Sequence, residues 1–145
     1  MTRRESREAA MRFVFEQEFD IARTPDEIML SAREDRGEDA VGSFAEQLFR
    51  TVSDNTGDID EKIADASQNW KFDRIGKVTL AVLRVACAEL FWFPEIPVEV
   101  TLNEALEIAR KYDDEKSLPC INGVLGRLTQ GLEKPEARKK PEDSE

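Results

Sequence analysis

The chain has 145 residues, a formal net charge of −10 and 40% hydrophobic residues, which suits one domain with a core of its own. No apolar run is long enough to cross a bilayer, and the charged amino-terminal segment lacks the features of a secretion signal, so we expect a cytoplasmic protein without membrane contact. With no histidine and only Cys87 and Cys120 as cysteines, the chain lacks the commonest zinc ligand and catalytic base, so we expect no metal site and no cofactor.

The first predicted helix runs from Thr2 to about Phe19 and gathers positive charge at its start. Thr2 and Glu5 match the capping box, in which each side chain bonds to the other residue's backbone N–H. Residues 1–12 contain four arginines and two glutamates, a net charge of +2. Cations at a helix start oppose the helix dipole, which indicates an external anionic partner. A solvated arginine face explains the pattern equally well.

Six more helices follow from the spacing of apolar residues and from start signals. The second begins at Thr24-Pro25, and the third covers residues 40–53. The other four have a candidate capping residue at or near their start, namely Asp58, Asp73, Thr101 and Ser117. No segment shows the alternation typical of a strand. We therefore predict an all-α fold of about seven helices.

The segment after Asp73 is the most apolar part of the chain and predicts the central helix. Its apolar residues occupy most sides, as is typical of a helix surrounded by others. Val82 and Cys87 are predicted core residues. Arg84 and Glu89 lie in the same segment, and because an unpaired buried charge is costly, we expect both to be paired or hydrogen-bonded.

The folded domain is predicted to cover residues 1–133, followed by a charged tail over residues 134–145. The tail carries four positive and four negative charges and no large apolar side chain, so it is expected to be disordered. Removing the +2 of the first twelve residues and the neutral tail from the total of −10 leaves −12 for the body. An acidic body disfavours broad binding to nucleic acid but leaves room for a local basic site.

An ordered series of short motifs spans Trp70 to Gln130. The motifs are Asp73-Arg74-Ile75, Val82-Leu83-Arg84-Val85-Ala86 with Glu89-Leu90, Ile96-Pro97-Val98-x-Val100, Leu102-Asn103-Glu104-Ala105 with Glu107-x-Ala109-Arg110-Lys111-Tyr112, and Ile121-Asn122-Gly123-Val124-Leu125. Each motif is weak alone, whereas the ordered set at this spacing is specific. Together with the arginine-rich first helix, the set resembles the NusB family over about residues 3–130.

The resemblance implies a fold and a function. The family fold is a helical bundle of two packed subdomains. Its members are transcription antitermination factors that bind the boxA element of ribosomal RNA transcripts as a heterodimer with NusE, a small-subunit ribosomal protein. The pair joins an antitermination complex on RNA polymerase. The resemblance therefore predicts an RNA-binding protein and not an enzyme.

The resemblance also implies which residues bind RNA and which bind the protein partner. Arginines suit phosphates, and an aromatic ring can stack on an unpaired base. The RNA-binding residues implied are Arg3, Arg4, Arg7, Phe15, Tyr112, Lys116 and Ser117. The partner-binding residues implied lie at the central helix and its approach, namely Asp73, Lys77 and Thr79. Three further motif residues are interpreted as structural, namely Asn103, Glu104 and Asn122.

Two other functions compete with this interpretation. Acidic residues cluster between Glu104 and Asp114, but helix surfaces are routinely acidic and the sequence has no glycine-rich phosphate loop, which disfavours an enzyme. An acidic helical bundle could instead be a protein-docking module, or form a homodimer, without strong RNA binding. This alternative predicts no preference for boxA RNA over a scrambled strand.

Overall fold

The computed structural model describes residues 1–68, 70–132 and 134. Over those residues it has seven α-helices, namely α1 (Arg3–Phe19), α2 (Pro25–Arg36), α3 (Ser43–Asp54), α4 (Thr56–Ala66), α5 (Lys77–Trp92), α6 (Val98–Tyr112) and α7 (Leu118–Leu128). Short 3-10 helices lie between them at Glu38–Ala40, Phe72–Arg74 and Glu115–Ser117. No strand occurs in this part of the chain, which confirms the predicted all-α fold.

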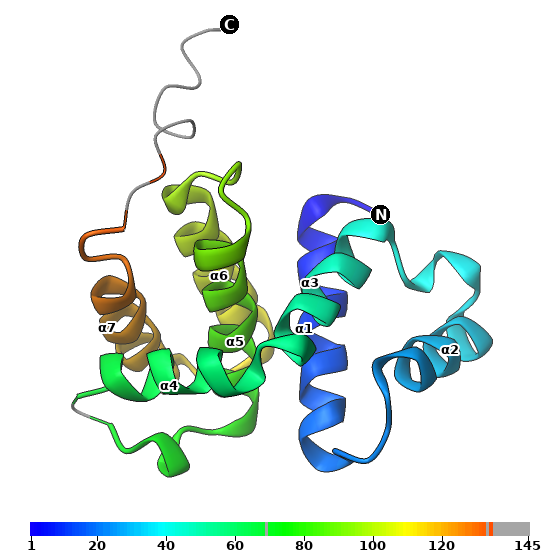
Figure 1. Cartoon of the computed structure of the whole chain (residues 1–145), viewed down its shortest axis with the longest axis horizontal. Coiled ribbons are helices and arrows are strands. Elements are labelled where there is room, and N and C mark those ends of the chain that lie inside the picture. Colours follow the sequence, from blue (N-terminus) through cyan, green and yellow to red (C-terminus); the bar gives the residue numbers. More distant parts are fainter. Residues whose placement is uncertain (69, 133, 135–145) are drawn as a thin grey trace, which may run out of the picture.

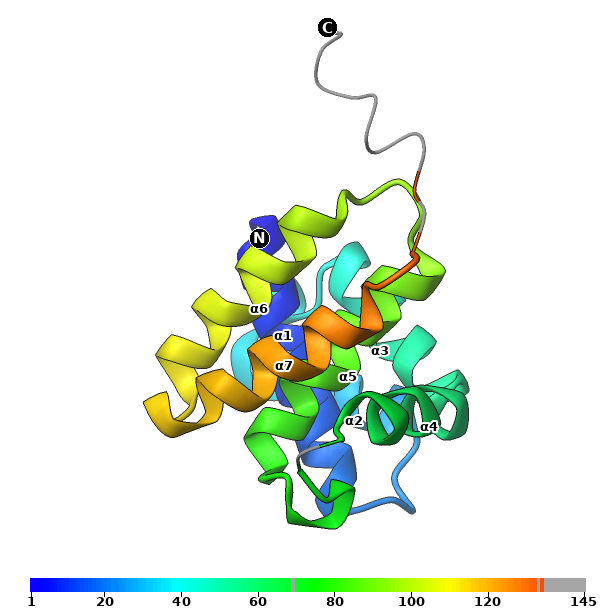
Figure 2. The same cartoon turned by 90° about the vertical axis from the view of Figure 1, so that its left-hand side faces the viewer.

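The helices form two groups that pack side by side. α1, α2 and α3 make up one group, and α4, α5, α6 and α7 make up the other (Figure 1). α1 and α3 pack against each other and both contact α5, so α5 joins the two groups. In the view turned by 90°, α6 and α7 lie in front of α5 (Figure 2). The arrangement confirms the predicted bundle of two packed subdomains.

The central position of α5 follows from its apolar sequence. Every residue from Thr79 to Leu90 is buried, and Val82 and Cys87 belong to the core as predicted. Burial raises the pKa of the Cys87 thiol to about 12, so the thiol stays protonated at neutral pH. No helix in the described ranges has both the length and the apolar character needed to cross a bilayer.

The two charged residues on α5 are both paired, which confirms the prediction. Arg84 donates from Nε to Asp60 Oδ1 at 2.8 Å and from Nη1 to Glu18 Oε1 at 2.7 Å. Glu89 is buried and accepts hydrogen bonds from Arg7 and from the Thr101 hydroxyl. These bonds tie α5 to α1, α4 and α6.

Helix starts were predicted well where a capping box is present and poorly elsewhere. Capping boxes open α1 and α2, with Thr2 and Thr24 as the capping residues. The other four candidates make no side-chain cap at their helix, namely Asp58, Asp73, Thr101 and Ser117. α4, α5 and α6 begin after Asn55, Gly76 and Pro97 instead, so those three predicted starts were wrong by three or four residues. Ser117 does precede α7, but its hydroxyl donates to the Asp114 carbonyl.

Lys134, the first residue assigned to the tail, packs against the end of α5. Its Nζ donates to the carbonyl oxygens of Glu89, Phe93 and Ile96 at 3.1, 3.1 and 2.8 Å. The carbonyls of Glu89 and Phe93 also accept backbone hydrogen bonds, from Phe93 and Ile96, and the negative end of the helix dipole attracts an ammonium group to this end of α5. Contacts with the helical body therefore reach Lys134, while residues 135–145 lie outside the described residues.

Candidate nucleic-acid interface

One face of α1 carries a row of charged and aromatic side chains. Arg4, Glu8, Arg12, Phe15 and Phe19 follow one another at intervals of three or four residues, which places them on a single side of the helix. α6 borders this row, because ion pairs join Arg4 to Glu104 and Glu8 to Lys111. The row thus brings together parts of the chain that are about a hundred residues apart.

The two exposed arginines expected to bind RNA lie at the start of α1, where Arg4 begins this row and Arg3 points toward α3 instead. Arg4 donates from Nε and Nη2 to the two carboxylate oxygens of Glu104, each at 2.8 Å. These hydrogen bonds lower the pKa of the Glu104 carboxyl and raise the pKa of Arg4. The Arg3 guanidinium lies over the Phe44 ring, 3.9 Å from its centroid. Both arginines are exposed, and their charges are accessible from solvent.

Arg7 differs from these two arginines, because its side chain is buried. It forms an ion pair with the buried carboxylate of Glu89, at 2.5 Å from Nε and 3.1 Å from Nη2. Thr101 donates a further hydrogen bond to Glu89 at 2.8 Å. A guanidinium enclosed in this way is not available to a phosphate at the surface. Arg7 is therefore a correction to the expected RNA-binding set, and its role in this fold is structural.

Tyr112 lies midway along the row, where α6 ends. Its hydroxyl donates to Glu8 Oε1 at 3.1 Å and accepts from Arg12 Nη1 at 3.3 Å. Lys111 Nζ lies 3.2 Å from the same Glu8 oxygen and 5.2 Å from the centroid of the Tyr112 ring. The hydrogen bond to Glu8 raises the pKa of Lys111 and keeps it charged. Tyr112 is thus an aromatic ring held between two cations.

Lys116, Ser117 and Thr79 line a groove beyond Tyr112. The groove has a volume of about 500 Å³ and runs between the start of α5 and the turn that precedes α7. Three of its residues are cationic, namely Lys71, Arg74 and Lys116, and one, Asp114, is anionic, so the groove is cationic on balance. The Thr79 hydroxyl donates to Asp113 Oδ2 at 2.5 Å, which joins this groove to the end of α6. The structure therefore brings part of the expected RNA site and part of the expected partner site together.

The other expected partner residues lie outside this groove. Asp73 is exposed in the 3-10 helix at Phe72–Arg74. Lys77, at the start of α5, forms an ion pair with Glu18 at 2.9 Å, close to the end of α1. Of the residues interpreted as structural, Glu104 pairs with Arg4, whereas Asn103 and Asn122 are exposed on their helices.

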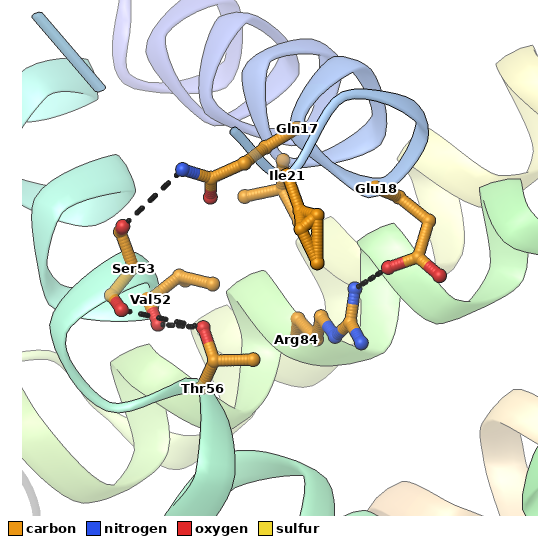
Figure 3. Close-up of a pocket in the computed structure, with 8 residues that line it drawn as sticks. Gln17, Glu18, Ile21, Val52, Ser53, Thr56 and Arg84 are labelled. Carbon is orange, nitrogen blue, oxygen red and sulfur yellow. Dashed lines mark hydrogen bonds and ion pairs between the residues drawn. The ribbon is translucent and has the colours of Figure 1, made fainter. Parts of the chain in front are cut away.

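A second cleft, which the sequence did not predict, separates α1 from the junction of α3 and α4. It has a volume of about 340 Å³, and Gln17, Ser53 and Thr56 face it together with the Glu18–Arg84 ion pair (Figure 3). Gln17 Nε2 donates to the Ser53 hydroxyl at 3.4 Å, and the Thr56 hydroxyl donates to the Val52 carbonyl. Its charged groups are therefore engaged with each other, which ties the two helix groups together.

Sequence reasoning missed the residues that surround Tyr112, namely Glu8, Arg12 and Lys111. Their signal was available in part, because Glu8 and Arg12 share the helical spacing of Arg4 and Phe15. That Lys111 joins them depends on the packing of α6, which no local pattern shows. The described residues hold no group of three or more His, Cys, Asp or Glu side chains placed to share a metal ion.

Comparisons with known proteins agree on one family. A sequence model of the NusB family matches residues 4–130. The transcription antitermination protein NusB of Clostridium acetobutylicum is 35% identical over 133 residues, which cover 92% of this chain and 98% of that protein. The structure of T. maritima NusB superposes with a TM-score of 0.82 at 30% identity, over 95% of this chain and 98% of that one. A chain in the crystal structure of a plectonemic RNA supercoil superposes with a TM-score of 0.78 at 25% identity, over 89% and 94%.

Proposed function

Because this chain belongs to the NusB family of transcription antitermination proteins, we propose that it binds the boxA element of ribosomal RNA transcripts as a heterodimer with NusE. In this proposal the pair joins the antitermination complex on RNA polymerase, and the chain acts by binding and not by catalysis. A solved structure with the same fold comes from a crystal that contains RNA, which supports RNA as the ligand.

The observation that carries the proposal is the continuous face from Arg4 to the groove beyond Tyr112. Along this face an exposed arginine, an aromatic ring and a cationic groove follow one another within an acidic protein. Single-stranded RNA needs this combination, because cations bind phosphates and a ring stacks on an unpaired base. The residues assigned to RNA are Arg3, Arg4, Phe15, Tyr112, Lys116 and Ser117.

The partner surface is assigned to Asp73, Lys77 and Thr79, which adjoin the RNA face at the start of α5. Thr79 is buried, so it contributes to this surface only through the wall of the groove that it lines, whereas Lys77 is exposed and reaches the end of α1 through Glu18. A partner seated here would lie beside the RNA without covering Arg3 and Arg4. NusE would then extend the surface that RNA contacts, which explains why two proteins would bind more tightly than one.

The charge distribution predicts weak binding by this chain alone. Several cations on the face are already paired with carboxylates, such as Arg4 with Glu104 and Lys111 with Glu8. Few phosphate contacts are therefore available, and the salt dependence of binding should correspond to about two to four released counterions. Adding NusE should raise both the affinity and the salt dependence.

Fluorescence anisotropy with a labelled boxA strand and a scrambled strand, with and without NusE, tests the proposal. Arg3→Ala with Arg4→Ala should weaken binding of the boxA strand without changing helix content. Arg33→Ala with Arg36→Ala, at the far end of α2, removes the same charge elsewhere and should have a much smaller effect. If the boxA strand and the scrambled strand bind with equal affinity when NusE is present, the proposal is wrong and the docking-module alternative takes its place.

A further inference from the structure

Among the described residues, Arg12 is the cation on the RNA face that has a buried guanidinium nitrogen without a hydrogen-bond partner. Nη1 donates to the Tyr112 hydroxyl at 3.3 Å. Nε is buried and has no hydrogen-bond partner among the described residues. Nη2 likewise has no hydrogen bond in the described part of the chain, and unlike Nε it is not fully buried.

The neighbouring carboxylate does not neutralise Arg12. Glu8 is buried, and its oxygens are engaged by Lys111 and by the Tyr112 hydroxyl. The charged side chains that contact Tyr112 are thus two cations, Arg12 and Lys111, and one carboxylate, Glu8, and that carboxylate forms its ion pair with Lys111. Buried donors without partners are rare in folded proteins, because each one loses its hydrogen bonds to water, so each calls for an explanation, of which an absent water or ion is one.

We propose that Arg12 binds the phosphate of the nucleotide whose base stacks on Tyr112. This inference rests on the proposed RNA-binding function and names a residue for it outside the set implied by family resemblance. Nη2, which is not fully buried, supplies the hydrogen bond to a phosphate oxygen, and the positive charge is not offset by an ion pair within the described residues. The ring of Tyr112 supplies the stacking surface.

The same arrangement fixes the orientation of the ring. The Tyr112 hydroxyl accepts a hydrogen bond from Arg12 and donates one to Glu8, and both of these residues lie on α1. Stacking and phosphate binding are therefore positioned by one helix. Arg12 acts on the phosphate by direct contact and on the base indirectly, through Tyr112, and these two effects can be separated experimentally.

The test measures the affinity of the full chain, with NusE, for a boxA strand by anisotropy across a salt series. Arg12→Gln should weaken binding about tenfold or more, the usual effect of losing a charge-assisted hydrogen bond. It should also reduce the magnitude of the slope of log affinity against log salt concentration by about one, which corresponds to the loss of one phosphate contact. Arg12→Lys should keep the parent slope, because it keeps the charge. Arg36→Gln, which removes one exposed arginine from the end of α2, should change the slope little.

The outcomes separate this inference from the proposed function. If the parent prefers boxA RNA and Arg12→Gln changes neither the affinity nor the slope, the role of Arg12 is overturned and the proposed function stands. A loss of affinity with an unchanged slope overturns the phosphate contact and assigns Arg12 to positioning Tyr112, which Tyr112→Phe would then reproduce. Failure of the parent to prefer boxA RNA overturns both proposals. Circular dichroism and melting temperature, unchanged in Arg12→Gln, show that the variant is folded.

Discussion

Glu89 is the most enclosed charge among the residues that the structure describes. Its side chain is 1% exposed, and Arg7 and Thr101 are its partners within the core. Two charges taken out of water recover the cost of desolvation only through each other and through additional hydrogen bonds. The pair therefore fixes the register of α1, α5 and α6 more than it adds to stability.

Removing one partner of this pair should be far more costly than removing both. Glu89→Leu leaves the Arg7 guanidinium buried without a counter-charge, and we expect a loss of about 3–5 kcal/mol in the free energy of unfolding. Arg7→Met combined with Glu89→Leu should recover much of that loss. Urea unfolding of the two single variants and the double variant measures the difference. Equal losses in Glu89→Leu and the double variant would contradict this account.

At the scale of single residues, the sequence predicted which charges are paired but not with which partners. A charge within an apolar helix must find a partner, so the pairing of Arg84 and Glu89 followed from local sequence. The partner of Glu89 is 82 residues away in the chain, and only the tertiary fold reveals it. The error at Arg7 was avoidable, because Arg7 shares its spacing with Ala10 and Val14 on the apolar side of α1.

At the scale of helices, a small charge network joins α1, α4 and α5. Arg84 binds both Asp60 and Glu18, and Lys77 binds Glu18 as well. The hydrogen bond from Arg84 lowers the pKa of the Glu18 carboxyl below its ordinary value of 4.5. Glu18 therefore adds stability above pH 4.5, and this contribution is lost as pH falls through the lower pKa of the folded state.

Glu18→Gln should consequently flatten the acid side of the stability profile. The parent should lose stability more steeply than the variant as pH is lowered from about 4.5, since only the parent must protonate this carboxylate on unfolding. Urea unfolding at several pH values between neutral and strongly acidic gives both profiles. Glu61→Gln, at an exposed position of α4, is the matched control. Parallel profiles for the parent and Glu18→Gln would contradict the prediction.

A buried valine and an exposed valine test whether the stability of the fold depends on the apolar centre of α5. Val82 is 3% exposed in the centre of α5, whereas Val100 is 39% exposed on α6. Val82→Asp buries an unpaired carboxylate and should cost more than about 4 kcal/mol, enough to unfold most of the protein. Val100→Asp should change stability by about 0.5 kcal/mol or less. Thermal unfolding followed by circular dichroism compares them, and a folded Val82→Asp would show that the core tolerates charge there.

Helices were easier to predict than their ends. Apolar spacing, together with start signals such as Thr24-Pro25, predicted all seven helices of the described residues, because packing one face against a core imposes the helical period on the sequence. Helix starts were predicted correctly where Thr2 and Thr24 form reciprocal bonds with a glutamate three residues later. Asp73 is also a residue that commonly caps helices, but it lies in the 3-10 helix Phe72–Arg74. This short helix precedes α5, which begins only at Lys77.

At the scale of the whole molecule, the candidate RNA face depends on how the two helix groups meet. Glu8 and Tyr112 are 104 residues apart in sequence, and their hydrogen bond joins the first group to the second. Resemblance to a family could indicate Tyr112, because the family's RNA-binding residues can be transferred to the positions of this sequence that match its motifs. It could not indicate Arg12 or Lys111, whose roles follow from side chains that meet between helices.

Lys134 extends the folded body beyond the boundary expected from composition. Lys134→Met leaves the carbonyls of Glu89, Phe93 and Ile96 without this donor and should cost about 1–3 kcal/mol in the free energy of unfolding. A chain that ends at residue 137 retains Lys134 and should be as stable as the full chain. Differential scanning calorimetry of both variants makes the comparison. Full stability in Lys134→Met would show that the contact adds nothing.

The enclosure of Lys134 also has a kinetic consequence. Amine-acylating reagents modify a lysine only when its nitrogen is uncharged and within reach, and burial lowers the pKa of Lys134 while closing it to the reagent. Lys77, whose side chain is 51% exposed, has no such barrier. Labelling at Lys134 must therefore wait for the end of α5 to release its side chain, whereas labelling at Lys77 need not. The ratio of the two labelling rates, read by mass spectrometry, measures how often this edge of the protein opens.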